Sequence, residues 1–197
     1  MVAAVQTSVT TKASTEDRYL IGMWVALAAI LMMFTSLTSA YIVRAAASND
    51  WRPIAMPPVL LLSTGLIVTS SVTIELARRK LKAALESSYR GWLLLTTALG
   101  LGFLVSQLLA WRQLVRQGVY VASNPHSSFF YLLTGTHGVH LLGGLLALIY
   151  LLFRNRKAGE RDSDPAKRLA SASAVTLYWH FMDVLWIYLF LLLFFWR

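Results

Sequence analysis

The chain has 197 residues, of which 57% are hydrophobic and 14% are charged, whereas about a quarter of the residues of an average soluble domain are charged. This composition excludes an ordinary water-soluble globular protein of the same length. The sequence contains no cysteine, so the chain by itself forms no disulfide, iron–sulfur cluster or thiolate copper centre. The formal net charge is +9.

Four stretches of the chain lack charged residues and a fifth contains only Asp183. Each is long enough to cross a hydrocarbon core of about 30 Å as a helix. The fold class predicted is all-α, a polytopic membrane bundle of five transmembrane helices forming one domain, residues 18–197, after a polar N-terminal tail, residues 1–17. The helices are expected at about residues 18–44, 54–77, 90–115, 128–153 and 170–196.

Lysine and arginine are divided unequally between the two sides of this predicted bundle. Thirteen lie on the side of the N-terminal tail, and five (Arg44, Arg52, Arg112, Arg116 and Arg197) lie on the other. Because cytoplasmic loops carry the excess of positive charge, we expect the N-terminus in the cytoplasm and the C-terminus outside. The net charge then indicates topology and attraction to anionic lipid heads, with no nucleic acid as a partner.

Small and hydroxylated residues concentrate in the second and fourth predicted helices. Helices in lipid are held together by close backbone contact and interhelical hydrogen bonds, because no hydrophobic force drives them together there. We therefore expect these positions to mark helix–helix contacts, in this chain or with another subunit. They are Ser63, Thr64, Gly65, Thr69, Ser70, Ser71 and Thr73, and Gly135, Thr136, Gly138, Gly143 and Gly144.

Three histidines and an aspartate lie inside the last two predicted spans, where polar side chains usually face protein or water. His137 and His140 share one helix face, as do His180 and Asp183, because they are three residues apart. The helix rise places His140 and His180 at about the same depth, roughly 12 to 15 Å from the cytoplasmic edge. We therefore predict an interhelical polar cluster near the middle of the membrane.

Four interpretations of this polar cluster remain open. It could be a structural hydrogen-bonded cluster, a contact with a lipid head group or a partner subunit, a pair of haem ligands, or a proton relay that ends at Asp183. The bulky side chains of Trp179, Phe181 and Trp186 argue against room for a haem. No catalytic residues and no metal site are predicted in this chain.

The last helix also carries a recognisable pattern. Residues 178–186 (Tyr-Trp-His-Phe-Met-Asp-Val-Leu-Trp) closely resemble the closing signature of the haem–copper oxidase subunit III family. Similar correspondences occur in residues 21–24, 63–73, 100–107 and 129–143, so the resemblance covers all five helices in order. The chain is similar to the five-helix bacterial forms of that family.

This resemblance implies a non-catalytic subunit III of a bacterial aerobic terminal oxidase of the cytochrome c oxidase type, in the bacterial inner membrane. Members of the family bind no haem or copper themselves. They pack beside the catalytic subunit I, which holds haem and copper with its partner subunits, and they bind phospholipid. They also support proton uptake and the lifetime of the enzyme during turnover.

Two positions depart from the family pattern, because Ile30 and Ala110 stand where the family has acidic residues. This leaves open a divergent branch, an accessory subunit of a nitric oxide reductase. A different class, a small membrane b-type cytochrome or transporter, also remains open. At the membrane boundary we expect Trp24, Tyr41 and Arg44 to lie near lipid or interfacial water, and Trp179 to lie near lipid beside the polar cluster.

Overall fold

The computed structural model describes residues 2–47, 49–157 and 165–196. These residues form five α-helices and no strand, and each helix is long and apolar enough to cross a membrane. The predicted all-α fold class with five spans is therefore confirmed. The helices are α1 (Val2–Ala47), α2 (Val59–Lys82), α3 (Glu86–Arg116), α4 (Pro125–Lys157) and α5 (Pro165–Phe195).

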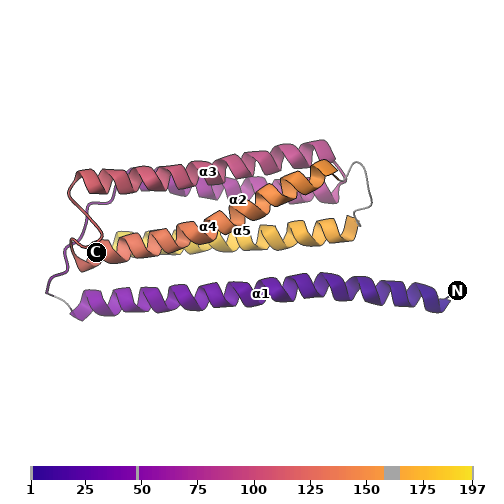
Figure 1. Cartoon of the computed structure of the whole chain (residues 1–197), viewed down its shortest axis with the longest axis horizontal. Coiled ribbons are helices and arrows are strands. Elements are labelled where there is room, and N and C mark those ends of the chain that lie inside the picture. The colour runs from indigo at the N-terminus through magenta and orange to yellow at the C-terminus, as the bar shows by residue number, and fades with distance from the viewer. Residues whose placement is uncertain (1, 48, 158–164, 197) are drawn as a thin grey trace.

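The helices run roughly along one axis and alternate in direction (Figure 1). α2 and α3 share the most extensive contact, α4 and α5 lie beside them, and α1 lies on the far side of α4 and α5. Among the described residues, α1 contacts α5 and α4 but neither α2 nor α3. Only 11% of the most apolar window of α1 is buried, against 33% to 44% in the other helices, so α1 offers the most surface to lipid or to another subunit.

The first helix is much longer than predicted, because α1 begins at Val2 and not near residue 18. The part of α1 that is apolar enough to cross a membrane is Leu20–Ala47, so the polar tail, residues 1–17, stays a prediction for a segment outside the span, although it is helical. No proline or glycine occurs before Gly22, so nothing in the chain breaks the helix there. With 46 residues, α1 is about 69 Å long and extends beyond the hydrocarbon core.

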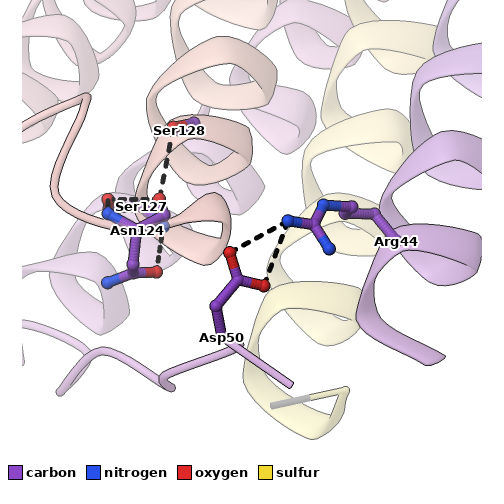
Figure 2. Close-up of polar contacts among 5 residues, drawn as sticks. All are labelled: Arg44, Asp50, Asn124, Ser127 and Ser128. Carbon is purple, nitrogen blue, oxygen red and sulfur yellow. Dashed lines mark hydrogen bonds and ion pairs between the residues drawn. The ribbon is translucent and has the colours of Figure 1, made fainter. Parts of the chain in front are cut away.

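α4 begins at Pro125 and not near residue 128, because Asn124 and Ser127 cap the helix start there. The Asn124 side-chain oxygen accepts a hydrogen bond from the Ser127 backbone N–H at 3.1 Å, and the Ser127 hydroxyl accepts one from the Asn124 N–H at 3.2 Å (Figure 2). This reciprocal arrangement is a capping box, and proline suits the first helical position. α5 likewise begins at a proline, Pro165, and not near residue 170.

A single residue in the left-handed backbone conformation follows the end of each of α2 and α3. Gly118 has φ +76° after α3, and the backbone N–H of Val119 donates to the Leu114 carbonyl at 3.0 Å. After α2 the same position is held by Ala84, with φ +56°, and the Leu85 N–H donates to the Lys80 carbonyl at 3.0 Å. Both are Schellman turns, which usually use glycine at the left-handed residue.

Candidate functional site

The structure separates the predicted polar cluster into two environments. His137 and His140 of α4 lie among aromatic rings, whereas His180 of α5 hydrogen-bonds to α2. No hydrogen bond joins the two α4 histidines to His180 or Asp183 in the part of the chain that the structure describes. Equal depth therefore did not bring the four side chains into one hydrogen-bonded network.

His137 is completely buried among rings from three other helices. Its ring centroid lies 6.4 Å from Phe34, 5.9 Å from Phe103 and 5.2 Å from Trp186. Neither ring nitrogen has a hydrogen-bond partner among the described residues. His140 uses Nδ1 within its own helix, 2.8 Å from the Thr136 carbonyl oxygen.

These surroundings bear on the interpretation of the histidines as haem ligands. A haem needs space beside the ligating imidazole for its macrocycle, but aromatic rings from α1, α3 and α5 cover His137. His140 directs Nδ1 to the backbone of its own helix. The residues present therefore do not fit a bis-histidine haem at this position.

His180 and Asp183 face α2. The His180 Nδ1 atom lies 2.6 Å from the Ser71 hydroxyl, which also lies close to Asp183. Asp183 is 3% exposed, and no hydrogen bond of ordinary geometry reaches either carboxyl oxygen from the described residues. Such a buried polar group is costly without a partner.

A groove of about 460 Å³ opens beside Ser71 and His180 on the α2–α5 face. Its charged residues are Glu75 and Arg79, whose side chains form an ion pair of 3.1 Å. Arg78 also pairs with Glu75, at 2.8 Å. The groove therefore has little uncompensated charge, and His180 is its other ionisable residue.

Trp179 is a central buried side chain and not a surface residue. Its indole nitrogen donates to the Ser70 hydroxyl at 2.9 Å. A Cβ atom on Gly100 would lie 2.7 Å from Trp179 Cη2, and one on Gly144 would lie 3.3 Å from Trp179 Cε3. The two glycines thus leave the space that the indole fills between α3 and α4. Trp179 is fully buried in this chain, so its side chain has no exposed surface for the lipid contact that the sequence predicted.

Hydroxyl groups of α2 take part in five hydrogen bonds to other helices among the described residues. This agrees with the expected helix–helix contacts, although Thr69 and Gly65 face away from the bundle. The sequence did not identify the partner side chains on α3 and α5. Besides the bonds from Trp179 and His180, Gln107 donates to Ser63 at 3.0 Å, Trp186 donates to Thr64 at 3.1 Å, and the hydroxyls of Thr73 and Thr96 are 2.8 Å apart.

The three residues expected at the membrane boundary differ in exposure. Trp24 is 60% exposed on α1. Tyr41 is buried, and its hydroxyl donates to the Trp196 carbonyl at the end of the chain. Arg44 forms an exposed ion pair of 3.0 Å with Asp50 (Figure 2). Trp24 and Arg44 are therefore exposed to lipid or interfacial water, whereas Tyr41 joins α1 to the residue that follows α5 by a hydrogen bond.

The two positions where the family has acidic residues lie in or against the core. Ala110 is completely buried, and Ile30 is partly buried against the same cluster of apolar side chains. Each position is thus filled by apolar packing.

The fold and these contacts define a class: a multi-pass α-helical membrane protein in which several buried polar side chains join helices of the same chain. In the described ranges, no group of three or more His, Cys, Asp or Glu side chains is placed to hold a metal ion. A comparison with known families then gives a specific assignment. The chain belongs to the cytochrome c oxidase subunit III family, whose sequence model matches residues 5–197.

Individual relatives agree with this assignment. The probable cytochrome c oxidase subunit 3 of Mycobacterium tuberculosis is 35% identical over 184 residues, which cover 90% of this chain and 87% of the relative. The cytochrome c oxidase subunit 3 of Bacillus sp. (strain PS3) is 31% identical over 173 residues, 86% of this chain and 82% of the relative. That of Synechocystis is 30% identical over 182 residues, 90% and 76% respectively.

Family membership confirms the resemblance found in the sequence and gives the chain the role of a non-catalytic subunit III of an oxidase. As such it forms a complex with other oxidase subunits. The five apolar helices and the family together make it a multi-pass protein of the bacterial inner membrane.

Proposed function

We propose that the chain packs directly beside subunit I, the haem- and copper-containing catalytic subunit, retains phospholipid there, and supports proton uptake during oxygen reduction. The observation that carries this proposal is the family match over residues 5–197. The largely exposed apolar face of α1 supports it, because this helix offers the greatest area to a partner. Haem and copper are held by the partner subunits.

Asp183 supports an additional role in assembly. Its carboxyl group is buried without a hydrogen-bond partner of ordinary geometry in the described part of the chain. A buried polar group in a membrane protein commonly faces a partner or marks a functional position. The Asp183–Ser71–His180 group is therefore proposed as a structural polar cluster that also influences how the α2–α5 face meets lipid or a neighbouring subunit.

The proposed support of turnover is tested with the oxidase purified with and without this chain. Both preparations are set to the same initial rate of oxygen consumption, and activity is followed over many turnovers. We expect the enzyme that lacks the chain to lose activity sooner and to regain its lifetime when the chain is added back. Equal lifetimes in the two preparations would contradict this part of the proposal.

We propose that the N-terminus is cytoplasmic and the C-terminus lies outside, on the basis of the unequal distribution of lysine and arginine. Because the chain has no cysteine, a single introduced cysteine is the only thiol in this chain that can be labelled, and its labelling reports the orientation. A membrane-impermeant maleimide added to intact cells (spheroplasts where an outer membrane is present) should label Ala122→Cys, in the α3–α4 connection. It should label Ser87→Cys, at the start of α3, only after the membrane is opened, and the reverse pattern would invert the topology.

A nitric oxide reductase accessory subunit remains the second candidate within the family. The names of the relatives favour the oxidase, since those compared above are called cytochrome c oxidase subunit 3. The two candidates differ in the metal content of the partner, which is measured by metal analysis of the complex purified with the tagged chain.

A further inference from the structure

A groove of about 720 Å³ lies between the C-terminal part of α3 and the N-terminal part of α4. Its walls are mostly apolar and include Leu108 and Val115 from α3 and Leu132 from α4. All three side chains are exposed in this chain. The space is within the range of roughly 300–1,000 Å³ that is common for pockets binding small molecules, and its apolar walls suit hydrocarbon.

Two arginines also line this groove. Arg112 and Arg116 are one helical turn apart, so they lie on the same face of α3. Both are exposed, and neither forms an ion pair within the described ranges of the chain. They directly follow the uncharged stretch 91–111, which places their guanidinium groups near the level of lipid head groups.

Hydrogen bonds join α4 to α3 and to the α3–α4 connection around the groove. The Tyr131 hydroxyl donates to the Val119 carbonyl at 3.0 Å, and the Ser128 hydroxyl donates to the Val121 carbonyl at 2.6 Å. These bonds fasten the α3–α4 connection over the start of α4. The Trp111 indole nitrogen donates to Thr134 at 3.2 Å, which fixes one wall.

Two other grooves lack this combination of apolar walls and unpaired positive charge. The groove beside His180 contains Arg79, but that arginine is paired with Glu75. The groove between α1 and α5, of about 400 Å³, is lined by Phe34, Phe181 and other uncharged residues. Charge complementarity therefore distinguishes the α3–α4 groove.

We propose that the α3–α4 groove binds one anionic phospholipid, with its phosphate between Arg112 and Arg116 and an acyl chain along Leu108 and Leu132. Arginine recognises phosphate through paired N–H donors. Arginines at this place could instead simply complement the negative end of the α3 dipole and extend to the interface. The lipid site predicts selectivity for an anionic head group, and the dipole role predicts none.

The test measures lipid bound to the assembly that the tagged chain forms after mild-detergent extraction, by native mass spectrometry. Phosphatidylglycerol and phosphatidylcholine with identical acyl chains are added separately after delipidation. We expect Arg112→Gln and Arg116→Gln each to weaken phosphatidylglycerol binding about fivefold and to leave phosphatidylcholine binding unchanged. Val115→Trp, which fills the groove and keeps both charges, should lower the binding of both lipids.

Arg52→Gln is the matched control, because Arg52 is an exposed arginine on the same expected side of the membrane and does not line the groove. It should leave the binding of both lipids unchanged. Two results would overturn the inference. The first is that a chain with both Arg112→Gln and Arg116→Gln binds phosphatidylglycerol as tightly as the wild type does. The second is that Arg52→Gln weakens phosphatidylglycerol binding as much as the groove variants do. This inference rests on the proposed retention of lipid and names its site. If the purified assembly lacks a catalytic partner, only the proposed packing beside subunit I is contradicted, because lipid binding to this chain is measured in either case.

Discussion

The Trp179 indole nitrogen donates a 2.9 Å hydrogen bond to the hydroxyl of Ser70, which lies 109 residues earlier in the chain. This bond joins α5 to α2 at a buried position, and the Ser70 hydroxyl in turn bonds to the Ile67 carbonyl at 2.7 Å. Ser70 thus connects the last helix of the chain with the backbone of the second.

Replacing Ser70 with alanine leaves the buried Trp179 N–H without its acceptor. We expect the free energy of unfolding in mixed micelles to fall by about 1–2 kcal/mol. Thr69→Ala is the control, because the exposed Thr69 hydroxyl bonds only to the Gly65 carbonyl of its own helix. The idea fails when both substitutions have the same effect on unfolding.

The glycine at position 100 is required by the neighbouring indole. A Cβ there would lie 2.7 Å from Trp179 Cη2, so Gly100→Ala should destabilise the chain by about 1–3 kcal/mol through overpacking. Gly138→Ala is the control, since a Cβ at Gly138 would meet no atom within 4 Å. Thermal melting of the purified assembly should separate the two variants, and equal melting temperatures would show that the indole moves aside without cost.

The turn after α2 can be improved. Ala84 holds a left-handed conformation with φ +56°, which is costly for residues with a Cβ and free for glycine. Ala84→Gly should therefore stabilise the chain by about 1 kcal/mol in a denaturant titration. Ala83→Gly, at φ −82°, should give no gain, and a similar gain from both substitutions would argue against the conformational explanation.

The polar residues of α4 and α5 are predicted to act in assembly and not as haem ligands. His140→Leu or Asp183→Leu should lower the yield of assembled complex or its retained lipid, because each removes a polar group from the interior or from the face toward a partner. The haem absorption spectrum of the complex that does assemble should not change. A shifted spectrum in either variant would show that the residue acts on a haem.

The number of helices could be predicted because each membrane span needs a long uncharged stretch, which is visible in the sequence without knowledge of how the helices pack. The start of α4 was missed although its signal was present, since Asn124, Pro125 and Ser127 form the pattern of a capped helix start with proline at the first position. The early start of α1 lacks such a local signal, because residues 2–17 contain neither a strong helix breaker nor an apolar pattern.

The composition of the polar site could be predicted, but its geometry could not. Depth in the membrane follows from residue number, so the equal depth of His140 and His180 was available from sequence. The rotation of each helix about its axis decides which neighbour a side chain meets, and that rotation depends on packing. His180 therefore turned out to meet Ser71 of α2, and His137 to meet Phe103 and Trp186.

We propose that this chain, a non-catalytic subunit III, is attached to a haem- and copper-containing partner. This attachment is tested most directly by purifying the tagged chain from its native membrane in mild detergent and measuring metals, the optical spectrum and oxygen consumption. We predict haem and copper together with oxygen consumption, and loss of both metals from this chain when the partners are stripped away. Haem with non-haem iron and nitric oxide reduction, or haem that stays with the isolated chain, would contradict the account.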